Sequence, residues 1–334
     1  MLTRFAFISL ALAFTVSSAW SLSEERVNKE FNAPSGGKLV VDVSFGSIEL
    51  TGGNDDKVVL EAYRKIHSND EQREKEYFAQ SPIVVTQEGN TVTVRSRPNK
   101  DTQRWNWSGS ISMDARYTVR VPKTFSADLR TSGGAVSANG LTGEIKADTS
   151  GGKLKFGQLK GRLDARTSGG SITLEGCDGP QNIVTSGGEI DSRGGSGNLD
   201  ARTSGGSIAV RGFSGDTIVK TSGGALSLHE IKGSITGKTS AGSINATLVD
   251  PVPGDVRLES SAGSISVAVP AKAGLDVEAK TSMGRVRTEI PMLASRSDDD
   301  RLSGTLNGGG KSLYLRASVG SISIKPASSS NASR

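Results

Sequence analysis

Cysteine and histidine are almost absent from the chain. Cys177 is the single cysteine, so no disulfide can form within the molecule. The two histidines, His67 and His229, are far apart in the sequence, and a zinc site has no set of ligands from which to be built. Aspartate does not recur at the nine-residue spacing of calcium-binding β-rolls. We therefore expect no metal and no cofactor.

Aromatic residues and long apolar runs are also scarce. Aromatics make up 5% of the 334 residues, whereas glycine occurs 42 times, which indicates many turns and a thin core. The formal net charge is only +5, and the basic residues alternate with acidic ones without flanking an aromatic platform. This pattern does not favour a nucleic-acid partner. No segment after the N-terminal region is long and apolar enough to span a bilayer.

The N-terminal residues resemble an export signal. Arg4 is followed by an apolar run over residues 6–16, and the small residues Ala19 and Ser21 stand at candidate cleavage positions. This pattern predicts a secretory signal peptide over residues 1–21, with a membrane anchor as the alternative. No lipobox-type cysteine follows it. We expect an exported bacterial protein located in the periplasm, on the outer surface or in the medium.

The chain contains a strict internal repeat. The tetrapeptide Thr-Ser-Gly-Gly returns every 18 residues, and the seventh copy reads Thr-Ser-Ala-Gly. Looser copies stand at Ser260, Thr281 and Ala317, and an earlier one lies near Ser44. Such a period is the signature of a repeat architecture. The regular copies begin at Thr131, Thr149, Thr167, Thr185, Thr203, Thr221 and Thr239.

Each repeat contains two apolar pairs with the spacing of a β-strand. Counting the threonine as position 1, apolar or small residues recur at positions 6 and 8 and again at 15 and 17. Glycines at positions 3, 4 and about 13 mark two corners, which we attribute to backbone with positive φ. Position 11 is a further apolar slot between the corners. It is occupied by Leu141, Leu159, Cys177, Phe213, Ile231 and Val249.

Two architectures fit two strands per 18 residues. Equivalent strands can stack in parallel about 4.8 Å apart, or hairpins can form a meander. Columns of identical residues favour stacking, because a stacked arrangement places each residue directly over the equivalent residue of the next coil. We therefore predict an all-β, β-helix-like solenoid. Its expected parts are a signal peptide over 1–21, irregular coils and a cap with one short helix (between Asn69 and Gln80) over 22–120, regular repeats over 121–292, C-terminal coils and a cap over 293–326, and a disordered tail over 327–334.

The residues offer little support for catalysis. The repeated serines precede Gly-Gly without a G-x-S-x-G elbow and are expected to be turn residues. One enzyme hypothesis uses Asp164 and Asp200, which point outward two coils apart. Their spacing of about 9.6 Å is at the upper edge of the range for inverting glycosidases. Against it, Arg166 and Arg202 lie two residues further on the same faces, where we expect them to pair with these carboxylates.

Two surfaces are candidates for binding. Trp105 and Trp107 alternate in the sequence, so their indoles can face one way and stack on sugar rings, or they can cover the end of the solenoid as a cap. The other surface is the flat face formed by positions 5, 7 and 9, which is rich in serine and threonine and suggests ice binding. Charged residues such as Lys153, Glu189 and Arg211 interrupt this face and argue against ice.

Several segments resemble a bacterial family of "putative adhesin" domains of unknown function. They are FNAPSGGKLVVDVSFGSIELTG, YTVRVPKTFSADLRTSGGAVSANGLTGEIKADTSGG and LNGGGKSLYLRASVGSISI. The resemblance implies a β-solenoid, an envelope or extracellular location and no catalytic residues. We predict a noncatalytic envelope or surface module that binds a glycan or an envelope protein. The alternative is a carbohydrate-active β-helix enzyme that acts on polysaccharide.

Overall fold

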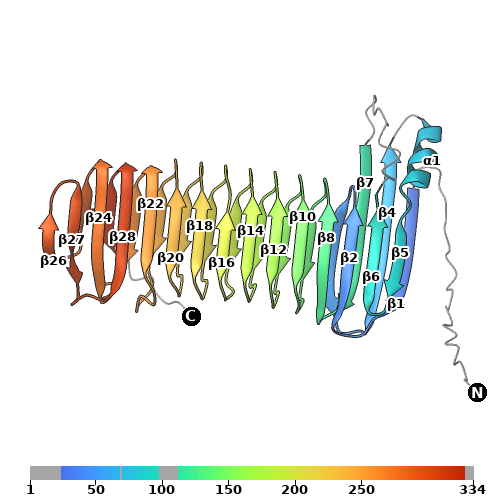
Figure 1. The fold of residues 1–334 in the computed structure, drawn as a ribbon, viewed down its shortest axis with the longest axis horizontal. Coiled ribbons are helices and arrows are strands. Elements are labelled where there is room, and N and C mark those ends of the chain that lie inside the picture. The colour runs from blue at the N-terminus through green and yellow to red at the C-terminus, as the bar shows by residue number, and fades with distance from the viewer. Residues whose placement is uncertain (1–23, 68–69, 98–111, 328–334) are drawn as a thin grey trace, which may run out of the picture.

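The computed structural model describes residues 24–67, 70–97 and 112–327, and it is an elongated solenoid of two facing β-sheets (Figure 1). Sheet A has 14 strands and sheet B has 15. Neighbouring strands of the regular part pair in parallel at an offset of 18 residues, as in the pairing of Leu154 with Ile172. The predicted solenoid is confirmed, and the meander is excluded for this region.

Each regular coil gives one strand to each sheet. The sheet A strands hold repeat positions 6 to 9, and those of sheet B end at or next to the repeat threonine. In sheet A these are β9 (Val136–Asn139), β11 (Leu154–Gly157), β13 (Ile172–Glu175), β15 (Ile190–Arg193), β17 (Ile208–Arg211), β19 (Leu226–His229) and β21 (Ile244–Thr247). In sheet B they are β8 (Phe125–Thr131), β10 (Ile145–Thr149), β12 (Leu163–Thr167), β14 (Gln181–Thr185), β16 (Leu199–Arg202), β18 (Thr217–Thr221) and β20 (Ile235–Thr239).

At the N-terminal end, β2 and β3 form one further coil against β8 and β9. Beyond this coil, sheet A continues through β7, β4 and β1, and sheet B through β6 and β5. The single helix of the described residues, α1, lies at this end (Figure 1). The elements are β1 (Glu24–Asn32), β2 (Gly37–Val43), β3 (Ser47–Gly53), β4 (Lys57–His67), α1 (Glu71–Gln80), β5 (Val84–Glu88), β6 (Thr91–Ser96) and β7 (Ser112–Pro122).

At the C-terminal end, the order in space differs from the order in sequence. The strands β28 and β29, which come last in the chain, lie between β22 and β24 in sheet B and between β23 and β25 in sheet A. The antiparallel strands β27 and β26 then end sheet B. The elements are β22 (Val256–Ala262), β23 (Ile265–Val269), β24 (Leu275–Met283), β25 (Val286–Thr288), β26 (Leu293–Ser297), β27 (Arg301–Leu306), β28 (Lys311–Val319) and β29 (Ile322–Pro326).

The core is a stack of aliphatic columns between the two sheets. Side chains at position 6, such as Ile172 and Ile208, are fully buried, and each contributes about 1.5–3 kcal/mol by burial. The slot at position 11 is also buried, with Phe213 at 0% and Cys177 at 2% exposure. Val249 is the exception to the predicted slot. It is half-buried, and Leu248 takes the interior place, because residues 250–254 lengthen this corner.

Threonine at position 1 is buried because its hydroxyl joins adjacent coils. Thr167 Oγ1 donates a hydrogen bond to the carbonyl of Gly152 in the preceding coil, at 2.9 Å, and accepts one from the amide of Gly170, at 3.2 Å. Both bonds recur at the equivalent threonines from Thr149 to Thr239. Loss of the hydroxyl would leave buried polar backbone groups without partners, which is costly.

The two glycine corners have different physical causes. The prediction of positive φ holds for the corner near position 13, where Gly161 has φ of 125° and Gly179 of 114°. It is wrong for the Ser-Gly-Gly corner, where neither glycine of the pair Gly169–Gly170 is in the left-handed region. A Cβ on Gly170 would lie 1.8 Å from the carbonyl oxygen of Gly152. This glycine is therefore required by the close stacking of adjacent coils.

The first glycine of the pair is not under this constraint. A Cβ on Gly169 would have its nearest neighbour at 3.8 Å, and Ala241 occupies the same position in a later coil. We predict that Gly170→Ala lowers the free energy of unfolding by about 1–3 kcal/mol, as overpacking does. Gly169→Ala is the matched control and should change it by less than about 0.5 kcal/mol. Denaturant unfolding followed by circular dichroism measures both, and equal effects would contradict the stacking explanation.

Candidate functional site

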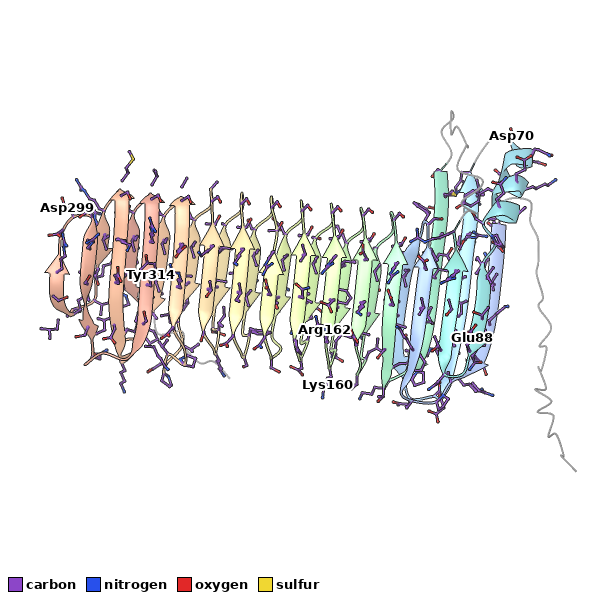
Figure 2. The ribbon with its side chains drawn as sticks, in the orientation of Figure 1. Asp70, Glu88, Lys160, Arg162, Asp299 and Tyr314 are labelled. Carbon is purple, nitrogen blue, oxygen red and sulfur yellow. The ribbon has the colours of Figure 1, made fainter. Side chains whose placement is uncertain are left out.

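The outer face of sheet B holds the two carboxylates of the enzyme hypothesis. Asp164 on β12 and Asp200 on β16 are separated by Asn182 on β14, which pairs in register with both. They are therefore two strand spacings apart, about 9.6 Å. Two shallow depressions of about 310 Å³ each run along this face, and Arg162, Asp164 and Asn182 line both. Figure 2 shows Arg162 on this outer surface, at the level of the regular coils.

Both carboxylates are held by arginine. Arg162 contacts Asp164 at 2.7 Å, and Arg202 contacts Asp200 at 2.5 Å. The predicted pairing of Arg202 is confirmed, but that of Arg166 with Asp164 is wrong, since Arg162 takes the place. Residues two before and two after Asp164 lie on the same face, so spacing alone could not choose between them. The Asn182 side-chain amide also donates to Asp164, at 3.1 Å.

These contacts work against acid catalysis. The hydrogen bond from Arg162 holds the pKa of the Asp164 carboxyl below its usual range. An inverting glycosidase needs one carboxyl of its pair protonated as the general acid, which requires a raised pKa. Asp164 is shifted in the opposite direction. The spacing of the pair is therefore only at the upper edge of the range for an inverting glycosidase, and Asp164 lacks the raised pKa of a general acid.

The same local pairing recurs along sheet B. Arg130 binds Asp128 at 2.7 Å within one strand, and Lys238 reaches Glu259 on the next strand at 2.8 Å. Glu259 is also paired with Arg257. Several charges on this face are thus paired within one coil or between adjacent coils. The result is a surface of mixed charge that has little net attraction for a polyanion or polycation.

The outer face of sheet A carries a hydrogen-bonded set of three polar side chains that the sequence did not suggest. His229 Nε2 is 2.9 Å from Ser227 Oγ, and its Nδ1 is 3.0 Å from Thr247 Oγ1 on the adjacent coil. The set resembles a nucleophile and its base, but in a catalytic triad a carboxylate stabilises the imidazolium. Thr247 has no charge, and Arg211 pairs in register beside His229. This group therefore serves as a hydrogen-bonded part of the strand surface.

A larger depression, of about 720 Å³, lies on the outer face of β1, β4 and β7. We call it the N-terminal depression. The Arg26 guanidinium lies 5.0 Å from the centre of the Tyr63 ring, and the Tyr63 hydroxyl contacts Glu24 at 3.3 Å. Charged, amide, hydroxyl and aromatic groups converge here from four strands, since Ser47 of β3 also lines the depression. Its lining includes Arg26, Asn28, Glu61, Tyr63, Asp114 and Arg116.

The sequence could not identify this depression, because its residues come from positions as far apart as 26 and 116. The alternation of polar residues at 26 and 28, 61 and 63, and 114 and 116 was the only available sign. The candidates Trp105 and Trp107 lie outside the described residues. The predicted signal peptide over 1–21 and nearly all of the tail lie outside them as well.

Cys177 is buried in the core, and this burial raises the pKa of its thiol. A protonated thiol without access to solvent is a poor nucleophile. In residues 24–67, 70–97 and 112–327, no group of three or more histidine, cysteine, aspartate or glutamate side chains could hold a metal ion. In the same ranges no helix has the length and apolar character needed to cross a membrane.

The in-register coils, the buried threonine column and the charge-paired faces define a parallel β-solenoid repeat protein. The chain belongs to the Toastrack DUF4097 family, whose model matches residues 37–325. The resemblance noted from the sequence is thereby confirmed, and with it the fold class. No curated protein matches the chain significantly.

Several solved structures are similar over much of their length, at low identity. A "putative cell adhesion protein" from Clostridium sporogenes is 11% identical, with 91% of this chain and 100% of that chain covered and a TM-score of 0.25. A "putative adhesin" from Bacteroides fragilis is 12% identical, covering 90% and 96%, with a TM-score of 0.30. One from Parabacteroides merdae is 12% identical, covering 74% and 94%, with a TM-score of 0.33.

The state of Asp164 can be measured directly. We predict that its carboxyl titrates below the usual range for aspartate and that Arg162→Gln moves the pKa upward. Because the folded pKa is lowered, the carboxylate stabilises the protein at neutral pH, and this contribution is lost as the pH falls through the folded pKa. Carbon-13 NMR of the carboxyl groups during an acid titration measures both values. A raised pKa in the unmodified protein would support a general acid at this position.

Proposed function

We propose that the protein is a noncatalytic, exported module of the bacterial envelope or cell surface that binds a polar partner, either a glycan or an envelope protein. The regular coils act as a rigid rod, and the N-terminal depression is the binding surface. Residues 1–21 would serve as the signal peptide and be removed on export. Residues 22–120 would form the cap, 121–292 the rod and 293–326 the opposite cap, with 327–334 as a tail.

The observation that carries the proposal is the size and composition of the N-terminal depression. Its charged side chains Arg26, Asp114 and Arg116 have ion-pair partners, as those of sheet B do, but here they surround an aromatic ring and an amide. Along sheet B, acidic groups such as Asp164, Asp200 and Asp128 are each bound to an arginine two residues away in the same coil. The N-terminal depression brings together an aromatic ring, an amide and charges of both signs in a hollow of about 720 Å³. Convergent polar groups around an aromatic ring suit a ligand rich in hydroxyl and charged groups.

Export is supported by the apolar run over residues 6–16 after Arg4, and an exported chain with a single cysteine fits a bacterial periplasm, outer surface or medium. The alternative function, a carbohydrate-active enzyme, depends on Asp164 and Asp200. It is weakened by the arginine pairs that hold both groups. Trp105 and Trp107 remain a second proposed contact for sugar rings.

A binding screen of the purified protein against a glycan array and solubilised envelope fractions tests the proposal. We expect a specific ligand whose affinity falls at least about tenfold when Glu61→Gln is combined with Tyr63→Ala, because both side chains line the depression. Asp164→Asn with Asp200→Asn is the matched control on sheet B, and it should bind as the unmodified protein does.

The other outcomes separate the remaining hypotheses. Loss of binding with Trp105→Ala and Trp107→Ala would add the indoles to the binding surface, whereas unchanged retention would leave them the role of a cap. Polysaccharide cleavage that disappears with Asp164→Asn and Asp200→Asn would establish the enzyme instead. The absence of any ligand in the screen would contradict a binding role and leave a structural one.

A further inference from the structure

Among residues 24–67, 70–97 and 112–327, the two sheets end in four strands that pair on one side only: β1 and β25 in sheet A, and β5 and β26 in sheet B. Open edges are normally made short, irregular or charged, because they invite pairing with another strand. In the described part of the chain, β25 has three residues, β5 has five, and β26 has five with a bulge between Ala294 and Arg296. The edge strand β1 carries five charged residues, but it runs for nine residues in unbroken register with β4, so a strand that pairs with it must match its charges.

We propose that β1 is a homodimer interface, in which it pairs antiparallel with β1 of a second copy about a twofold axis at Asn28. The pairing would join the two copies of sheet A into one continuous sheet. This inference does not depend on the proposed ligand. It depends on the length of the free edge and on the order of charges along the strand EERVNKEFN.

Most registers of such a pair are unfavourable. If both copies keep their inner faces on the same side of the joined sheet, the twofold axis must pass through a residue and not between two. An axis at Arg26, Lys29 or Glu30 sets that charged residue directly opposite its own copy. An axis at Val27 sets Glu24 opposite Glu30 of the second copy. Like charges directly opposite each other are destabilising.

An axis at Asn28 avoids every such clash. It sets Arg26 of each copy opposite Glu30 of the other, so two pairs of opposite charges form, and it sets the two Asn28 residues opposite each other. This register also uses all nine residues of the strand. Among the registers that keep the inner faces aligned, it combines the longest overlap with complementary charge.

The side chains concerned are available on the outer face. The Arg26 side chain is 66% exposed and Glu30 is 54% exposed. Arg26 lies 3.7 Å from Glu24, and Lys57 contacts Glu30 at 2.6 Å, so an incoming Arg26 would extend an existing row of alternating charges. On the inner face, Val27 and Phe31 are only partly buried at this end of the core. This register sets Lys29 of the second copy opposite Val27 and Glu25 opposite Phe31, so their cover would come from the aliphatic stems of charged side chains.

The dimer would bring the two N-terminal depressions together. Arg26 and Asn28 line this depression, and both are on the strand through which the axis passes. The two rods would extend in opposite directions from the joined N-terminal ends, with β26 and β27 at the far tips (Figure 1). Two adjacent copies of one surface suit a partner that is itself repetitive or polymeric, through multivalent binding.

Sedimentation equilibrium of the purified protein tests the interface. We expect a mass of twice the chain, and we expect Arg26→Glu and Glu30→Arg each to weaken association at least about tenfold. The combined variant Arg26→Glu with Glu30→Arg should restore the dimer, because the opposite pairs are re-formed with exchanged signs. Arg120→Glu, the same charge change on the outer part of β7 away from the edge, is the matched control and should remain dimeric.

A mixture of the two single variants gives the sharpest result. One copy then carries two acidic residues at positions 26 and 30 and the other carries two basic residues, so the mixture should form a heterodimer while each variant alone is monomeric. Misfolding could not produce this pattern, and circular dichroism of each variant verifies the fold. A monomeric unmodified protein at about 100 µM, or a mixture that stays monomeric, would overturn the proposal.

Discussion

The close contact between successive Thr-Ser-Gly-Gly corners is the constraint on which the rest of the structure depends. The carbonyl of Gly152 lies so near Gly170 that a single added carbon cannot fit, and the hydroxyl of Thr167 closes the corner by bonding both coils. Each bond contributes only about 0.5–1.5 kcal/mol. The bonds stabilise the fold because they repeat along the stack: each coil is held on two sides and shares its stability with its neighbours.

Exact stacking also determines the surfaces. Once equivalent positions lie over one another, each outward column becomes a line of side chains about 4.8 Å apart, and like charges in one line would repel. Asp164, Asn182 and Asp200 show one solution, in which a neutral amide separates two carboxylates and each carboxylate has its own arginine. These carboxylates of the regular coils are therefore engaged by neighbouring side chains and are less available for a ligand. Distinctive surfaces occur where the repeat ends, at the irregular strands β1, β4 and β7.

The features that follow from the 18-residue repeat could be predicted from the sequence. Those that depend on contacts between coils or between distant segments could not. The period gave the two strands per coil, the parallel register and the buried slot of Cys177. The cause of the Gly169–Gly170 corner was misassigned, because a close approach between coils is invisible in one sequence. The partner of Asp164 was misassigned because two arginines are equally spaced from it. The insertion of β28 and β29 into the stack, like the N-terminal depression, depends on segments far apart in the chain, for which the repeat gives no information.

In-register stacking is measured most directly by distances between equivalent exposed positions. Spin labels placed in pairs at Ser132 and a later corner serine, in a Cys177→Ala background, can be compared by double electron–electron resonance. The separation from Ser132 should rise with each coil, to about 19 Å at Ser204 and about 24 Å at Ser222. Distances that alternate or fail to increase along the series would contradict the stacked solenoid.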